Sequence, residues 1–192
     1  DFCENLHRTL ALAVHRGSVD LARERGAFPL YDSAREAANP FIKRLAEAEP
    51  ALYSDMVKYG RRNIALLTIA PTGTTSLMTQ TSSGLEPVFR ISYKRRRKVN
   101  PNDKNARVTF TDEVGDSWED YHVFHVPFKQ WLRTAGYDPA QVEHLPEAEL
   151  NAIIEKSPWY RATAEDVDWV NKVHLQGRVQ KWVDHSISVT VN

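Results

Sequence analysis

The sequence is poor in cysteine, net charge and long apolar runs, and each shortage excludes a class of protein. One cysteine in 192 residues rules out an internal disulfide and a metal site built from several cysteines. It also fits a reducing compartment, so we expect a cytoplasmic protein. Lys and Arg total 25, as do Asp and Glu, so no excess charge draws the chain to nucleic acid or to an anionic membrane. No apolar run approaches the ~20 residues of a membrane span.

What the chain has instead is an ordinary globular composition. Hydrophobic residues make up 42% and charged residues 26%, so there is enough apolar surface for a core, and a wholly disordered chain is excluded. The chain has no initiator Met and no signal-peptide pattern, and residues 187–192 resemble a strand that stops in mid-pattern. We therefore expect a fragment of a longer protein.

The first sixty residues have the pattern of amphipathic helices. Apolar residues recur at helical spacing over 5–25, and Gly26 is expected to end that helix. Asn39 followed by proline has the form of a cap and a first helical residue, which predicts a helix to about residue 48. A further helix is expected over 51–58, and the segment between the first two helices is expected to be a connector.

An uninterrupted apolar run from Ile64 to Ala70 breaks this helical pattern. Its length favours a strand buried on both faces, as in parallel sheets. The turn Pro71-Thr72-Gly73-Thr74-Thr75-Ser76 follows at once, and we expect a helix to start between Thr72 and Ser76. Unpaired amides, the positive end of the helix dipole and a glycine would let an anion bind there without a lysine. On this pattern alone, simple N-capping by Thr72 or Thr74 is the preferred interpretation.

A β-hairpin is expected in the second half of the chain. Val88–Tyr93 is predicted to be one strand and Arg107–Thr111 the return strand, with the turn-forming segment 100–105 between them. The other predicted elements are short helices at 127–134 and 147–156, a helix opened by a capping box at Thr163–Asp166, and a strand at 186–191.

Five consecutive basic residues, Lys94 to Lys98, are the most concentrated charge in the chain. Such a run could serve a standalone binding or interaction module, for example one for nucleic acid. Alternation along a strand would divide the run between two faces, and several acidic residues follow closely. A solvated hairpin arm, or pairing with these acids, is therefore favoured. The acids are Asp112, Glu113, Asp116, Glu119 and Asp120.

Two small groups of reactive side chains are more simply explained as structural. His122 and His125 have no cysteine or carboxylate at a spacing that completes a zinc site. The segment Asp184-His185-Ser186 holds the residue types of a hydrolase triad, but adjacent residues rarely converge in that geometry. We therefore predict no catalytic residue and no metal ligand in this chain.

Four blocks of the sequence, in family order, closely resemble the large chain of ribonucleotide reductases. The form Ala-Pro-Thr-Gly-Thr, followed by Ser-Ser-Gly-Leu-Glu-Pro, is most similar to the adenosylcobalamin-dependent class II enzymes, and the diiron class I enzymes are the alternative. Residues 100–158 match little of the family. The four blocks are residues 25–32, 62–76, 81–89 and 182–192.

The resemblance implies an α/β fold: a partial segment of the ten-stranded α/β barrel of ribonucleotide reductase, helix-rich and with a β-hairpin. Residues 1–192 would form a single piece from the C-terminal side of that barrel domain. Within it, residues 1–60 would be helical, residues 61–93 would hold a strand, the phosphate loop and a helix, and residues 94–192 would hold the hairpin, helices and a strand.

The resemblance also implies a binding role for the turn that follows the apolar run. In the family, the matching turn holds the substrate phosphate through main-chain amides at a helix start. Pro71 has no N–H, so it could contribute only packing or its carbonyl. The residues carried over by the motif are Ala70, Pro71, Thr72, Gly73, Thr74 and Thr75.

The residues that carry out the family's radical chemistry, however, are missing from this chain. The radical cysteine flanked by Asn and Glu is absent, as is the reducible cysteine pair, and Cys3 lies outside any matching motif. The parent enzyme would reduce ribonucleotides to 2′-deoxyribonucleotides with a radical generated by adenosylcobalamin. We expect the chain alone to be inactive and not to bind that cofactor. Its expected partners are the ribonucleotide and the remainder of the reductase chain, and unpaired strand edges would also allow a homo-oligomer.

Overall fold

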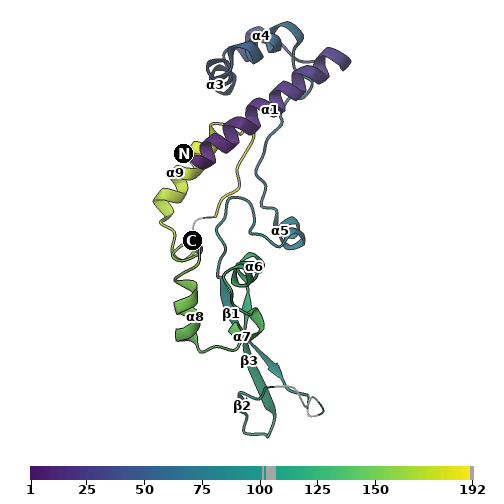
Figure 1. Ribbon diagram of the computed structural model, residues 1–192. Coiled ribbons are helices and arrows are strands. Elements are labelled where there is room, and N and C mark those ends of the chain that lie inside the picture. The colour runs from purple at the N-terminus through teal and green to yellow at the C-terminus, as the bar shows by residue number, and fades with distance from the viewer. Residues whose placement is uncertain (101, 103–106, 191–192) are drawn as a thin grey trace. The chain divides into compact units, whose positions relative to one another are not determined.

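The computed structural model describes residues 1–100, 102 and 107–190 (Figure 1). The described residues form two compact units. Of the described residues, the first unit contains 1–72 and 168–190, and the second contains 73–167 without the gaps at 101 and 103–106. Both units hold helices, and the second also holds a three-stranded antiparallel sheet, so the chain is a mixed α/β structure, as expected.

Helices dominate the first unit, and the three predicted for the first sixty residues are confirmed. Gly26 ends α1 with φ 80°, a left-handed conformation that glycine adopts without strain. The Asn39 side chain accepts a hydrogen bond from the Phe41 amide and so caps α3. The helices of this unit are α1 (Phe2–Arg25), α2 (Ser33–Glu36), α3 (Pro40–Ala48), α4 (Pro50–Tyr59) and α9 (Trp169–Gln180).

The segment expected to be a plain connector holds the short helix α2. The Asp32 carboxylate accepts hydrogen bonds from the amides of Ala34 and Arg35, which is typical N-capping. A helix of four residues has too little periodic pattern to be recognised from apolar spacing, so only the capping aspartate signalled it.

The core of the first unit forms where α1, α3 and α4 meet. Leucine and isoleucine from one face of α3 pack against small and branched residues of α1, and Trp182 closes the cluster from the segment after α9. Burying such side chains stabilises a fold by about 1.5–3 kcal/mol each relative to exposure. The buried members are Ala11, Val19, Ile42, Leu45, Leu52, Met56 and Trp182.

The predicted buried strand over residues 64–70 is wrong. The segment is extended, but it makes only one isolated parallel bridge, between Ile69 and Ile187, and Ile64 is 67% exposed. The strand predicted at 186–191 is likewise limited to that bridge in residues 186–190, and Val191 lies outside the described residues. An apolar run becomes a doubly buried strand only where strands flank it and layers cover both faces, and the described residues supply one short neighbour. The parallel direction expected for the run is nevertheless present in the bridge.

The sheet of the second unit has the order β1-β3-β2, with all pairs antiparallel. Its strands are β1 (Ser92–Lys98), β2 (Phe110–Thr111) and β3 (Ser117–Phe124). The predicted hairpin pairing is therefore wrong. β1 begins at Ser92 rather than at Val88, and it pairs along its whole length with β3. The segment 107–111 contributes only the two residues of β2, which pair with the other edge of β3.

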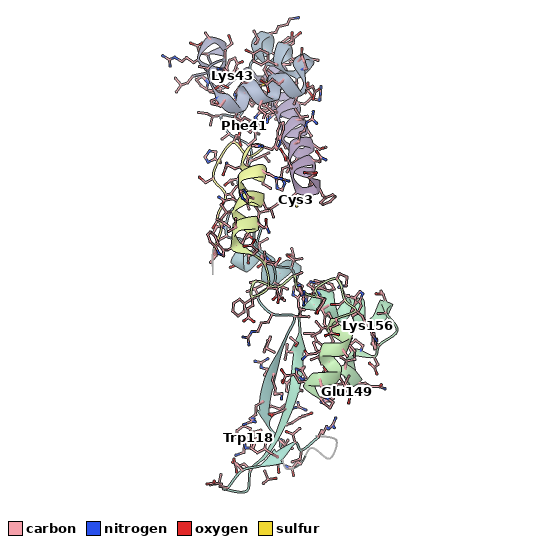
Figure 2. All side chains as sticks on the ribbon, turned by 90° about the vertical axis from the view of Figure 1, so that its left-hand side faces the viewer. Cys3, Phe41, Lys43, Trp118, Glu149 and Lys156 are labelled. Carbon is pink, nitrogen blue, oxygen red and sulfur yellow. The ribbon has the colours of Figure 1, made fainter. Side chains whose placement is uncertain are left out.

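β1 pairs with β3 rather than with residues 107–111 because β3 is longer and its composition favours a strand. It supplies eight residues that include Trp118, Tyr121, Val123 and Phe124, side chains that favour a pleated, half-buried surface. Trp118 stacks on Phe110 with the ring centroids 6.3 Å apart, and its position on the ribbon is labelled in Figure 2. The turn predicted at 100–105 lies largely outside the described residues.

Three helices complete the second unit beside the short α5 (Gly73–Thr79). The two predicted near 127–134 and 147–156 are confirmed as α6 (Val126–Thr134) and α8 (Glu147–Ile154), and α7 (Pro139–Val142) was not predicted. Phe128 is fully buried, with its ring 5.5 Å from that of Phe124. The buried core residues are Ile91, Phe124, Phe128, Leu132, Val142, Leu150 and Ile153.

Only half of the capping box predicted at Thr163–Asp166 forms, and it does not open the helix expected there. The amide and the hydroxyl of Thr163 both donate to the Asp166 carboxylate, at 3.2 and 2.6 Å. Helix α9 starts later, at Trp169, where the Asp168 carboxylate accepts from the Val170 amide at 3.0 Å. The residue that caps the helix is therefore Asp168 rather than Thr163.

Candidate functional site

The turn proposed from the resemblance to hold phosphate ends the extended segment and begins α5. The helix starts at Gly73, inside the predicted interval from Thr72 to Ser76, so that prediction is confirmed. Thr72 has φ 50°, an uncommon and strained conformation for a β-branched residue. All six predicted site residues, 70–75, are exposed.

Gly73 occupies the first position of α5 without any backbone need for glycine. Its φ does not lie in the left-handed region, and a Cβ added there would meet no atom within 4 Å. The absence of a side chain therefore leaves open space in front of the first turn, residues 73–75. The amides of a first turn have no intrahelical acceptor, so an anion that reaches them is favoured by hydrogen bonds and by the helix dipole.

A pair of serine hydroxyls joins α5 to the Ser-Ser-Gly-Leu-Glu-Pro segment of the motif block 81–89. Ser76, which is 7% exposed, donates to the Gly73 carbonyl at 2.8 Å, and its oxygen lies 2.9 Å from the Ser83 hydroxyl. The Thr81 amide donates to the Ser76 carbonyl at 3.0 Å. Gly84, in the block 81–89, lies in a turn with φ 52°. The two motif blocks are thus held together by side chains that the sequence only identified as small and polar.

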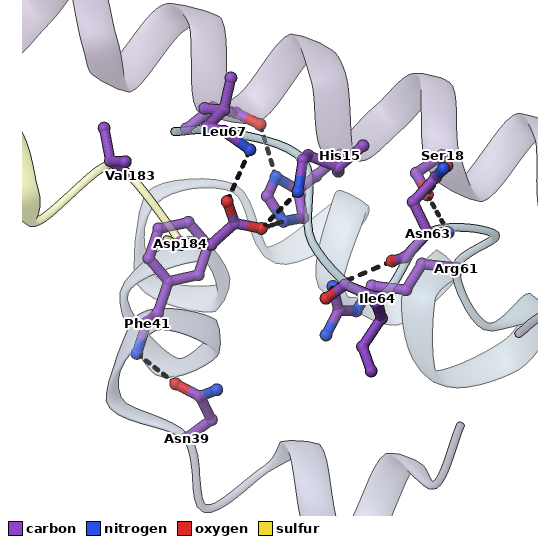
Figure 3. A network of polar contacts seen from close by, with 12 residues as sticks. His15, Ser18, Asn39, Phe41, Arg61, Asn63, Ile64, Leu67, Val183 and Asp184 are labelled. Atoms are coloured by element: carbon purple, nitrogen blue, oxygen red, sulfur yellow. Dashed lines mark hydrogen bonds and ion pairs between the residues drawn. The ribbon is translucent and has the colours of Figure 1, made fainter. Parts of the chain in front are cut away.

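In the first unit, a network of polar contacts holds the extended segment that precedes the loop (Figure 3). The Asp184 carboxylate accepts hydrogen bonds from the amides of Leu66 and Leu67, at 2.9 and 2.7 Å. The Ser18 hydroxyl donates to the Asn63 side chain and accepts from the Asn63 amide, at 3.1 and 3.0 Å. Asp184 is therefore not part of a hydrolase triad, in agreement with the structural role that the sequence favoured.

Arg61 is the buried cation of this network. Its side chain is 6% exposed and forms a two-pronged ion pair with Glu36, with the closest contact at 2.8 Å. One guanidinium nitrogen also donates to the carbonyls of Asn63 and Ile64, at 3.1 and 2.7 Å. A hollow of about 320 Å³ lies beside this cluster, and Arg61, Ile64 and Asp184 are among its lining residues.

His15 lies fully buried at the centre of the network. Its Nδ1 donates to the Ala11 carbonyl at 2.9 Å, because a carbonyl can only accept. Its Nε2 has no hydrogen-bond partner among the described residues and lies 3.8 Å from Asp184 Oδ2. Burial lowers the pKa of His15 from its usual value, and this outweighs the nearby carboxylates of Asp184 and Glu36, which act in the opposite direction.

Sequence reasoning found the loop but missed this network. Arg61 stands one residue before a motif block. His15 lies on the buried face of α1 with Ala11 and Val19, whereas the leucines whose spacing predicts this helix, Leu6, Leu10 and Leu21, are exposed. The apolar spacing of the sequence therefore did not identify these residues or their partners.

The basic run is a strand whose cations pair with β3. Arg96 contacts Asp120 at 2.7 Å and Arg97 contacts Glu119 at 2.7 Å, each pair directly opposite in the ladder. Lys98 pairs diagonally with Asp116. The pairing with following acids that the sequence favoured is confirmed, and these three cations are already paired with acids of β3 and of the turn before it.

The remaining candidate side chains have structural surroundings. The His122 ring stacks on Phe124 at 6.4 Å and His125 packs against Trp159 at 6.4 Å, and burial lowers the pKa of both histidines. Cys3 is half-buried near the start of α1 (Figure 2). Within the described residues, no three His, Cys, Asp or Glu side chains cluster in a way that could hold a metal, and no helix has the length and apolarity for crossing a membrane.

Comparison with known proteins places these features in a family. The whole chain, residues 1–192, matches the family model described as ribonucleotide reductase, barrel domain. The vitamin B12-dependent ribonucleoside-diphosphate reductase of Mycobacterium tuberculosis (strain CDC 1551 / Oshkosh) is 37% identical over 196 residues, which cover 97% of this chain and 22% of the relative. The enzyme of the same name from Thermoplasma acidophilum is 26% identical over 185 residues, which cover 93% of this chain and 19% of the relative.

A third relative carries a different name. The ribonucleoside-diphosphate reductase subunit alpha of Treponema pallidum is 24% identical over 100 residues, half of this chain and 12% of the relative. The chain therefore spans about a fifth of the length of the curated relatives that it matches throughout. The match extends over all four motif blocks, so the resemblance seen in the sequence is confirmed. The chain belongs to the ribonucleotide reductase barrel-domain family.

Proposed function

We propose that this chain is part of the catalytic chain of a vitamin B12-dependent ribonucleoside-diphosphate reductase and that it contributes the loop that holds the substrate phosphate. The observation that carries the proposal is the family match over residues 1–192, with the loop motif at the start of a helix. The B12-dependent relatives match nearly the whole chain, whereas the subunit alpha relative matches half of it, which favours class II over the diiron class I. The names of these relatives favour a ribonucleoside diphosphate as the substrate.

The loop would bind phosphate mainly through its backbone. The amides of residues 73–75 can donate to phosphate oxygens, and the hydroxyls of Thr74 and Thr75 add further donors. Hydrogen bonds to a charged group contribute roughly 1.5–3 kcal/mol each. Pro71 has no N–H, so it can only shape the turn, and Ala70 and Thr72 would contribute through the main chain. No lysine is needed, because the helix dipole supplies the positive end.

Adenosylcobalamin would supply the radical in the parent enzyme. The single cysteine, Cys3, is half-buried on α1 and lies outside the family's motifs, so it is no candidate for the radical site. We therefore assign the chain no step of the radical chemistry, and we propose that it does not bind the cofactor alone. The remainder of the reductase chain is its proposed partner, in the cytoplasm, and a homo-oligomer is compatible with the position of β1 at the edge of the sheet that the described residues form.

The test is Gly73→Val in the complete reductase. The added side chain meets open space, so the fold should be retained, but it occupies the approach to the first-turn amides. We expect the dissociation constant of the ribonucleoside diphosphate to rise at least about tenfold, the effect of losing about 1.4 kcal/mol. Thr74→Val is the matched control: it keeps the amide and removes one hydroxyl, so a smaller effect is expected. If the diphosphate affinity of a folded Gly73→Val enzyme is unchanged, the loop does not bind phosphate and serves only as the N-cap of the helix.

A further inference from the structure

Asp184 contacts the backbone of Leu66 and Leu67, which precede it by 118 and 117 positions in the sequence. Its Oδ2 accepts from the Leu66 amide at 2.9 Å and its Oδ1 from the Leu67 amide at 2.7 Å (Figure 3). We infer that Asp184 is a positioning residue for substrate-phosphate binding: it sets the register of the extended segment that leads into the phosphate loop. The inference rests on the proposed function of that loop.

The two hydrogen bonds of Asp184 start a short parallel ladder that runs toward the loop. The His185 amide donates to the Leu67 carbonyl at 3.0 Å, the Ile69 amide to the Ser186 carbonyl at 3.1 Å, and the Ser188 amide to the Ile69 carbonyl at 2.8 Å. The Thr68 hydroxyl also donates to the Ser186 carbonyl, at 2.9 Å. The ladder ends one residue before Ala70, the first residue of the predicted loop.

Side-chain packing alone would define this register poorly. Ile64 is 67% exposed, and the segment 65–70 includes no fully buried residue. A shift of one residue reverses the direction of every side chain in an extended segment, and such shifts occur easily where neither face is firmly buried. A carboxylate that accepts two successive amides fits only one register, so the polar contact supplies the specificity that burial does not.

The surroundings of Asp184 make these two bonds its principal contacts. The carboxylate is 10% exposed, and Nε2 of His15, the nearest cationic candidate among the described residues, lies at 3.8 Å, beyond hydrogen-bond distance. Hydrogen bonds to an ionised acceptor are about twice as strong as neutral ones. The preceding residues are held separately, by Arg61 through the carbonyls of Asn63 and Ile64.

Asparagine is the informative replacement. It has nearly the same volume, but only one of its two terminal atoms accepts a hydrogen bond, so its amide nitrogen would face a backbone N–H of residue 66 or 67. One bond is lost and one buried amide is left unpaired. Asp168→Asn is the matched control, because Asp168 also accepts a backbone amide, that of Val170, and asparagine caps helices as well as aspartate does.

The experiment compares two ligands in the complete reductase. Dissociation constants for a ribonucleoside diphosphate and for the matching ribonucleoside are measured by calorimetry in the wild type, Asp184→Asn and Asp168→Asn. For Asp184→Asn we expect about tenfold weaker binding of the diphosphate, equivalent to about 1.4 kcal/mol, and less than about a twofold change for the nucleoside. Asp168→Asn should change neither. This selectivity for the phosphate is what a merely structural role would not produce.

Each other outcome decides against the inference. Unchanged diphosphate affinity in a folded Asp184→Asn enzyme overturns it, and so does an equal loss for both ligands. If Asp184→Asn does not fold, as judged by circular dichroism, Thr68→Val replaces it, because this exposed residue donates one bond of the same ladder. Unchanged diphosphate affinity in that variant also overturns the inference. If Gly73→Val leaves the diphosphate affinity unchanged, the proposed phosphate loop itself is refuted. If Gly73→Val weakens diphosphate binding but Asp184→Asn does not, only the role of Asp184 is refuted.

Discussion

The Nε2 atom of His15 lies 3.8 Å from Oδ2 of Asp184, and the histidine is completely buried. The imidazole is held by its other nitrogen, which donates to the Ala11 carbonyl. This histidine, whose pKa is lowered by burial, faces the carboxylate that holds the segment before the proposed phosphate loop. The stability of the first unit should therefore depend on the protonation of His15.

The stability of the chain should fall as the pH is lowered. Burial lowers the pKa of His15 from its usual 6.5, so between the two values the unfolded chain binds more protons than the folded chain. The stabilising contribution is complete above about pH 6.5 and is lost as the pH falls toward the folded-state pKa. Urea unfolding at about pH 7.5 and about pH 5.5 measures it.

A variant separates this effect from that of other histidines. His122 and His125 also have pKa values lowered by burial, so they contribute a loss of the same sign. His15→Gln should therefore reduce the pH dependence without abolishing it. A pH dependence equal to that of the wild type would show that His15 does not contribute.

Removal of Glu36 should destabilise the first unit strongly. Arg61 is 6% exposed and Glu36 is 18% exposed, so Glu36→Ala leaves a buried guanidinium without its counter-charge, at a cost of about 3 kcal/mol. Asp55→Ala is the control in the same unit: its ion pair with Arg23 is 41% and 40% exposed, and its loss should cost at most about 1 kcal/mol. Urea unfolding of both variants tests the difference, and equal effects would contradict it.

The basic strand should bind nucleic acid only after its partners are neutralised. Arg96, Arg97 and Lys98 are each about half exposed but paired with acids of β3 and the turn before it. The wild-type chain should not retard an oligonucleotide at about 0.15 M salt. The triple variant Asp116→Asn, Glu119→Gln, Asp120→Asn should do so, with an affinity that falls as salt rises. Tight binding by the wild type would support the standalone binding module instead.

The 192-residue chain should form no deoxynucleotide by itself. Its single cysteine, Cys3, is half-buried in α1 and outside the family's motifs, so the chain offers neither a radical cysteine nor a reducible pair. The assay supplies a ribonucleoside diphosphate, adenosylcobalamin and a dithiol, and follows the product by chromatography. Measurable turnover would disprove the proposed division of labour within the parent reductase.

Local chemistry made several parts of this protein predictable from its sequence. The cap at Asn39 and the stop at Gly26 concern residues within a few positions of each other, and the structure reproduces both. The start of α5 between Thr72 and Ser76 was predictable for the same reason. The family blocks added the role of residues 70–75 by resemblance, which no periodicity could supply.

Long-range pairing was decided only by the tertiary structure. The sequence could not indicate that β1 pairs with β3 rather than with residues 107–111, because only residues 107–111 alternate clearly and pairing depends on which partner buries more surface. Nor could it indicate that the apolar run 64–70 would remain extended with a single bridge, because burial on both faces requires neighbours that a local pattern does not specify. Asp184 belongs to a segment with the residue types of a hydrolase triad, for which the sequence favoured a structural role. Only the fold showed that its partners are the amides of Leu66 and Leu67, more than one hundred residues away.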